Sequence, residues 1–138
     1  DLLGRAEAER VLRMGENRLL TPVGLRTLSV EDRALRPRCD GGEMEREAAR
    51  HQGSVHPWLL GPYADAVFRV RGRTSNAYAR VEASLKYLLE EHLSEGCVGH
   101  VSELFHGANP HAPRGAPAHA PALGELIRVV SEIRGRLW

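Results

Sequence analysis

The residues best suited to carry chemistry stand in two blocks, and the first spans residues 51–63. This block combines the hydrogen-bonding side chains of His51 and Gln52 with Trp58, which stands immediately before an apolar stretch. Polar donors beside a helix N-terminus and an aromatic plane suit a sugar, whose hydroxyls need hydrogen bonds and whose C–H face stacks on rings. The same residues also suit a structural role, in which Trp58 and Tyr63 belong to the core and His51 caps a helix.

The second block, residues 101–107, places a carboxylate on a short apolar segment. Glu103 leads from there into a loop rich in Gly, Pro and His, which includes Arg114. A carboxylate held at the mouth of a cavity can act as a general base that activates a water, while a partner acid protonates the bond being broken. Considered alone, a glutamate in a loop is more often part of the solvated surface.

Histidine density raises the question of a metal site. Four histidines fall within twenty residues, at His100, His106, His111 and His119. No HxH, HxxH or HExxH spacing occurs, and the two cysteines, Cys39 and Cys97, lie outside this run. We therefore expect no metal and no cofactor.

Composition excludes several classes of partner. Nineteen Lys and Arg against 18 Asp and Glu give a formal charge of +1, which removes the main electrostatic argument for binding nucleic acid. No apolar run approaches the roughly 18 residues of a membrane span, so no membrane association is expected. The two cysteines form no CxxC pair and indicate free thiols in a reducing cytoplasm.

The elements that must position these residues are predicted to be helices. Apolar residues recur at spacings of three and four in four stretches, residues 6–20, 58–70, 76–93 and 122–137. No stretch alternates with period two for more than four residues, so we expect an all-α fold of about four main helices. The apolar stripes at 85–89 and 126–130 should face missing neighbours, which predicts self-association or marginal stability.

Two long connections interrupt the helices, one of about thirty-five residues and one of nearly thirty. Long structureless connections indicate either functional loops or a chain that is not an autonomous domain. Antiparallel helices with their long loops gathered at one end suit a barrel of helical hairpins, which four helices cannot close. A β-sheet of three or more strands would contradict this barrel.

Six blocks together carry a resemblance to a known family. They are Leu19–Ser29, His51–Val55, Pro57–Pro62, Val101–Phe105, Pro113–Gly115 and Glu125-Leu126. In order and spacing they resemble the C-terminal part of glycogen debranching enzymes, the amylo-α-1,6-glucosidases. The resemblance implies an incomplete α/α toroid, part of a barrel of six hairpins. Residues 1–138 would then be the C-terminal segment of one catalytic domain, with no internal boundary.

The resemblance also implies an activity and a site. The reaction would be hydrolysis of α-1,6-linked glucosyl stubs on glycogen or a related α-glucan, with inversion and with Glu103 as general base. The substrate-binding residues would be His51, Gln52, Trp58, Phe105 and Arg114. The family's catalytic acid is an Asp that precedes the matched region, and no residue here corresponds to it. We therefore expect the chain alone to be inactive and to need the missing N-terminal part of the same domain.

Several positions depart from the family's usual residues. Arg50 and His56 stand where members usually carry Tyr and Trp, and His106 stands where they carry Asp. Residues 116–121 replace a stretch that usually contains a further Trp. The lost aromatics favour the alternative hypothesis, a non-catalytic helical module that binds glucan or another partner and has kept the scaffold but lost the site.

Overall fold

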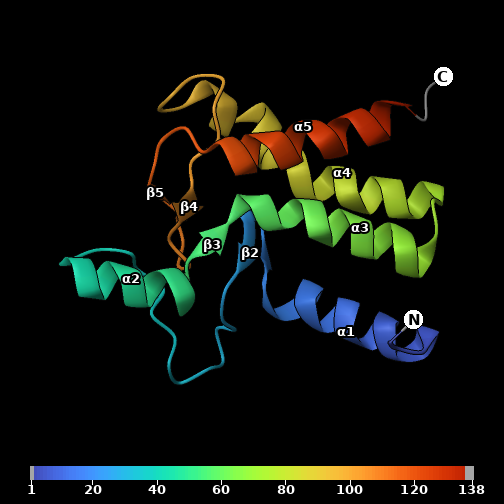
Figure 1. Ribbon diagram of the computed structural model, residues 1–138, viewed down its shortest axis with the longest axis horizontal. Helices are drawn as coiled ribbons and strands as arrows, with labels where there is room; N and C mark the ends of the chain where they lie inside the picture. The colour runs from blue at the N-terminus through green and yellow to red at the C-terminus, as the bar shows by residue number, and fades with distance from the viewer. Residues whose placement is uncertain (1, 136–138) are drawn as a thin grey trace.

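The computed structural model describes residues 2–135, and this part contains five α-helices and a small sheet (Figure 1). The helices are α1 (Arg5–Arg18), α2 (Glu43–His51), α3 (Leu60–Arg71), α4 (Ser75–Glu90) and α5 (Ala120–Gly135). The strands are β1 (Leu20–Thr21), β2 (Gly24–Arg26), β3 (Val55–His56), β4 (Leu104–Phe105) and β5 (Pro113–Arg114). Two single 3-10 turns, η1 (Pro57–Leu59) and η2 (His92–Ser94), precede α3 and follow α4.

Helices α3, α4 and α5 lie side by side, and α1 lies on the other side of α3 (Figure 1). The turn between α3 and α4 uses Gly72 at a φ of 72°, a conformation that glycine adopts without strain. Thr74 then caps α4 by accepting a hydrogen bond from the backbone N–H of Ala77. Residues 2–135 contain no helix that is both long enough and apolar enough to cross a membrane.

The four predicted helices correspond to α1, α3, α4 and α5, with ends that differ by a few residues. Residues 136 and 137, included in the last predicted helix, lie outside the described residues. Helix α2 was not predicted, because Ala49 is its only buried residue and an apolar stripe is therefore absent. The chain is helix-rich, as predicted, but it is not all-α.

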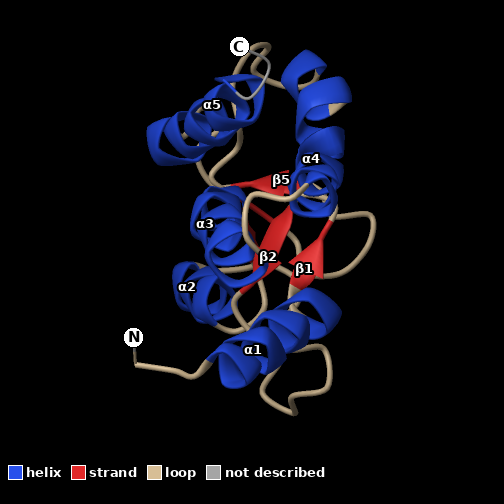
Figure 2. Ribbon diagram, turned by 90° about the vertical axis from the view of Figure 1, so that its right-hand side faces the viewer, coloured by secondary structure: helices blue, strands red, loops and turns tan. Residues whose placement is uncertain are grey.

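The correction comes from a five-stranded antiparallel sheet, ordered β1-β2-β3-β4-β5 (Figure 2). Each strand has only two or three residues, too few for an alternating pattern to be visible in the sequence. Strands β1 to β3 come from the first long connection and β4 and β5 from the second, joined where Val55 pairs with Phe105. The two connections therefore lie together as expected, but they are more regular than expected. A sheet of this size counts against the helical barrel, which the structure does not confirm.

The apolar core joins the sheet to the helices. Val55 and Phe105 from the sheet belong to the same buried cluster as Val67 of α3, Leu85 of α4 and Val129 of α5. The stripes that we expected to remain exposed are thus mostly buried within the chain. Two of their residues are exposed, Leu89 at 40% and Ile127 at 57%. Within these two stripes, only Leu89 and Ile127 offer exposed apolar surface for the expected self-association.

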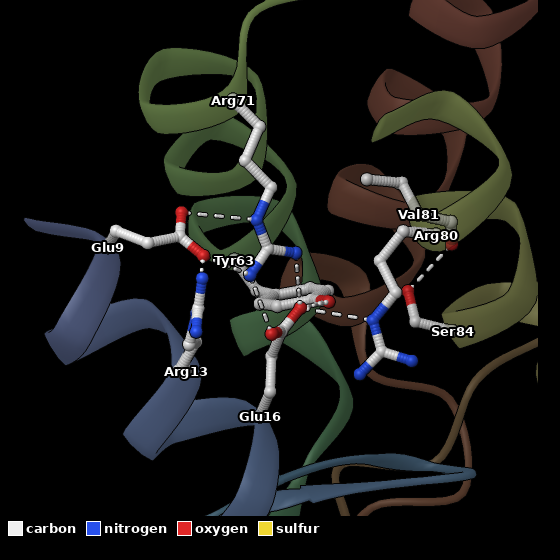
Figure 3. A network of polar contacts seen from close by, with 8 residues as sticks. All are labelled: Glu9, Arg13, Glu16, Tyr63, Arg71, Arg80, Val81 and Ser84. Atoms are coloured by element: carbon white, nitrogen blue, oxygen red, sulfur yellow. Dashed lines mark hydrogen bonds and ion pairs between the residues drawn. The ribbon is translucent and has the colours of Figure 1, made fainter. Parts of the chain in front are cut away.

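Helix α1 is held against α3 and α4 mainly by charged contacts, since Leu12 is its only buried residue. The Glu16 carboxylate accepts hydrogen bonds from Arg71, Tyr63 and Arg80, at 2.8, 2.9 and 3.0 Å (Figure 3). Burial alone would raise the pKa of Glu16, but these hydrogen bonds outweigh it and lower the pKa to about 2. This polar network, which also includes Glu9, links α1 to α3 and α4.

Candidate active site

Glu103 lies immediately before β4 and is fixed by the β4–β5 hairpin. Its backbone N–H donates to the carbonyl of Ala116 at 2.9 Å, and its Oε2 accepts the N–H of Ala116, also at 2.9 Å. Gly115 makes this approach possible, because a Cβ there would lie 2.5 Å from Oε2 and its φ is +69°. The Glu103 side chain is 18% exposed, which corrects the interpretation of a fully solvated loop residue.

The other oxygen of Glu103 is also occupied. Arg50, in the last turn of α2, donates from Nη1 to Oε1. The Ala116 N–H and the Arg50 guanidinium outweigh the effect of burial and lower the pKa of Glu103. Glu103 is therefore an ionised carboxylate at neutral pH, the state that a general base requires, but each of its oxygens already has a donor.

Replacing Gly115 by alanine should displace Glu103. The added Cβ would clash with Oε2 in a backbone conformation that strains any L side chain, so we expect a loss of about 1–3 kcal/mol in the free energy of unfolding. Gly124→Ala is the matched control, because nothing lies within 4 Å of a Cβ there and the helical position should gain up to about 1 kcal/mol. Urea unfolding measures both. Equal stabilities of the two variants would contradict the close approach of Glu103 to the loop.

Three more titratable side chains, Glu47, His51 and His56, lie around this carboxylate and its partner Arg50. Glu47 lies 3.4 Å from Arg50 Nε and 3.0 Å from His51 Nε2, so His51 and Glu103 share one side of the molecule. The His56 Nε2 lies 3.2 Å from the carbonyl oxygen of Arg50. Burial lowers the pKa of His56, which also feels the charges of Arg50 and Glu103.

His119, next to the N-terminus of α5, completes these surroundings. Its charge helps to lower the pKa of both Glu103 and His56, and its buried Nδ1 has no hydrogen-bond partner among the described residues. In the sequence, His119 stood out only as one of four closely spaced histidines, and the Arg50–Glu103 pair did not stand out at all. Arg50 and His56 were visible only as departures from the family's usual aromatics.

The five predicted substrate-binding residues are not gathered at Glu103. His51 is an exposed residue at the end of α2, where it contacts Glu47 and caps no helix. The carbonyl of Gln52 accepts the N–H of Arg36 at 2.6 Å, which gives Gln52 a structural role. Trp58 is 38% exposed on η1, beside α5. The alternative interpretation of this block, in which its aromatics form core, holds for Tyr63, which is 5% exposed.

The side chains of Phe105 and Arg114 lie in different surroundings. Phe105 is 1% exposed, with its ring edge-on to His92 at 4.8 Å between centroids, so the predicted contact with substrate is not available in this structure. Arg114 on β5 is partly exposed and lies 3.2 Å from Asp40. Arg114 is therefore next to Glu103 along the hairpin but is paired with another carboxylate.

A second polar cluster, around Asp40, connects the loops next to the site. Asp40 accepts hydrogen bonds from Arg38 and Arg114 and lies 3.4 Å from His106 Nε2. The Nδ1 of His106 accepts the N–H of Cys39 at 3.0 Å, and burial lowers the pKa of this imidazole. These contacts bind residues 36–40 to the loop after β4.

The main cavity of the described residues lies away from Glu103. A cavity of about 910 Å³ lies at the far end of α3 from the sheet, lined by Leu2, Leu3, Arg5, Ala8 and residues 69–72, and it contains no predicted site residue. Within residues 2–135, no group of three or more His, Cys, Asp or Glu could hold a metal ion. Cys39 and Cys97 are both free thiols.

Comparison with known families decides the relationship. The model of the family described as amylo-alpha-1,6-glucosidase matches residues 1–128. The chain belongs to the amylo-alpha-1,6-glucosidase family. The match confirms the resemblance to the C-terminal part of glycogen debranching enzymes, and it includes the whole sheet and Glu103. A comparison with curated proteins finds no match for this member of the amylo-alpha-1,6-glucosidase family.

Proposed function

We propose that this chain is the C-terminal segment of a glycoside hydrolase that removes α-1,6-linked glucosyl stubs from glycogen or a related branched α-glucan. The observation that carries the proposal is the placement of Glu103, a partly buried and ionised carboxylate held by a backbone N–H in a loop hairpin. A base needs this combination of fixed geometry and negative charge. The family match agrees with it.

In the proposed mechanism Glu103 takes a proton from a water as that water attacks the anomeric carbon. The attack comes from the face opposite the leaving oxygen, so the configuration inverts. An acid about 6.5–9.5 Å from Glu103 must protonate the leaving oxygen. We propose that the N-terminal part of the same domain supplies this acid. No cofactor takes part, and the expected compartment is the cytoplasm.

The second candidate function is a non-catalytic glucan-binding or interaction module. It is favoured by the two donors on Glu103, because Arg50 occupies Oε1 and Ala116 occupies Oε2. A carboxylate with a donor on each oxygen contributes to stability, and because these donors lower its pKa it is a weaker base toward a water.

The hydrolase and the glucan-binding form of the module both predict that the chain binds a linear α-glucan, and Trp58 provides the test. Isothermal titration calorimetry with maltoheptaose should show binding, and Trp58→Ala should weaken it by up to about tenfold through the loss of ring stacking. Leu89→Ala is the control, since Leu89 is an apolar residue of nearly equal exposure on α4. If the unmodified chain shows no heat of binding at millimolar glucan, the glucan hypothesis is wrong in both forms.

A further inference from the structure

Helix α2 stands apart from the helical layer. It projects from the sheet, away from α3, α4 and α5 (Figure 1). Its only buried side chain, Ala49, packs in a small cluster with Cys39 and Leu104, separate from the main core. Little apolar burial therefore holds α2 in place, and polar contacts contribute much of its attachment.

Arg50 is the polar contact that connects α2 to Glu103, and it has a second carboxylate within reach. Its Nη1 donates to Glu103 Oε1, while its Nε lies 3.4 Å from Oε2 of Glu47, one turn earlier in the same helix. The guanidinium can therefore leave Glu103 and still be paired with Glu47. The side chains of Arg50 and Glu103 are 34% and 18% exposed, so water can replace the broken contact at a modest cost.

We infer that Arg50 is a latch on Glu103, a positioning residue whose ion pair keeps the proposed base closed until α2 or the arginine side chain moves. In the closed position Oε1 is occupied by Arg50 and Oε2 by the Ala116 N–H. In the open position Arg50 stays with Glu47, and Oε1 accepts a proton from a water without competition from the guanidinium. The inference rests on the proposed function, because it concerns how a carboxylate whose negative charge is shared with an arginine could still act as a base.

Other ionisable side chains face the Arg50–Glu103 pair and can affect its ion pair. They are Glu47 on α2, His56 on β3, His119 before α5, and Cys39 in the preceding loop. Glu47 is the only carboxylate among them, so it is the partner that Arg50 would keep when the latch opens. Replacing Glu47 should therefore favour the closed position.

The test is a pH titration of the Glu103 carboxyl carbon by ¹³C NMR in the full 138-residue chain. Arg50→Gln should raise the pKa of Glu103 but leave it below its ordinary value, because the Ala116 N–H remains. Arg50→Lys should restore part of the lowering, and Glu47→Gln should lower the pKa further. The control is Arg46→Gln, on the same helix, whose side chain bonds the carbonyl of Gly41. An identical pKa in Arg50→Gln and Arg46→Gln would overturn the latch.

Amide hydrogen exchange supplies a second readout. Opening the latch should speed exchange in residues 47–51 by about two- to fivefold in Arg50→Gln and in Glu103→Gln alike, and the double variant should show no further increase. Independent, additive effects would overturn the inference. If both latch effects are found but no α-glucan binds, the proposed function fails and the latch stands. If glucan binds without a latch effect, only the latch fails.

Discussion

Replacing Glu103 by glutamine is expected to slow hydrolysis of an α-1,6-linked glucosyl stub by about 10²–10⁴-fold. Glutamine keeps the shape of the side chain but cannot take a proton from the attacking water. The measurement is glucose release from a branched dextrin by a longer polypeptide that supplies the catalytic acid. Binding of a linear α-glucan should change far less, because it depends mainly on contacts away from the base.

Glu95→Gln is the matched control for this change. Glu95 follows η2, is about half exposed and lies 3.9 Å from His92, so its loss should leave turnover unchanged. Hydrolysis by Glu103→Gln at the unmodified rate would show that Glu103 is not the base. Glucan binding by the longer polypeptide without any hydrolysis would instead favour the non-catalytic module.

The largest loss of stability is expected from Glu16→Gln in the polar network that holds α1. The change removes the charge of a mostly buried carboxylate that accepts from Arg71, Arg80 and Tyr63, and it leaves the two partly exposed arginines short of one anion. We expect the free energy of unfolding to fall by about 2–3 kcal/mol. Glu7→Gln, on the same helix but in an exposed pair with Arg10, should change it by less than about 0.5 kcal/mol.

The pH dependence gives an independent check on Glu16. Its pKa is about 2 in the folded chain against an ordinary value of 4.5, so the folded state favours the ionised form. The resulting stability is present above pH 4.5 and is lost as the pH falls towards 2. Urea midpoints between pH 5 and 2 should therefore decline more steeply for the unmodified chain than for Glu16→Gln. Parallel declines would contradict the low pKa.

The helices that form the main core could be predicted because their buried apolar residues recur at helical spacing in the sequence. Val81, Leu85 and Leu88 are buried on one face of α4, at the spacing that the sequence displays. The sheet produces no such pattern in the sequence, since β3 has two residues and pairs with β4 at a single position. Helix α2 was missed for the same reason, with Ala49 its one buried residue.

A site residue could be predicted only where a short sequence motif and the chemistry of the side chain single out the same position. Glu103 could be singled out from the residues around it, because a carboxylate entering a Gly- and Pro-rich loop is a local feature. Its pairing with Arg50 could not be, since 53 positions separate the two residues and charge alone does not choose among so many arginines. The burial of Phe105 could not be predicted from the motif, because an apolar residue beside a motif can face either the ligand or the core.

The single paired position between β3 and β4 has a consequence for how the chain assembles. Helices α3 and α4 are adjacent in sequence and can pack early, whereas Val55 and Phe105 must close a loop of 50 residues before they meet. The arginine and the glutamate of the site lie on opposite sides of that junction. Transient separation of the two strands would therefore separate Arg50 from Glu103 while the helical layer stays folded, so this ion pair should be lost before cooperative melting begins.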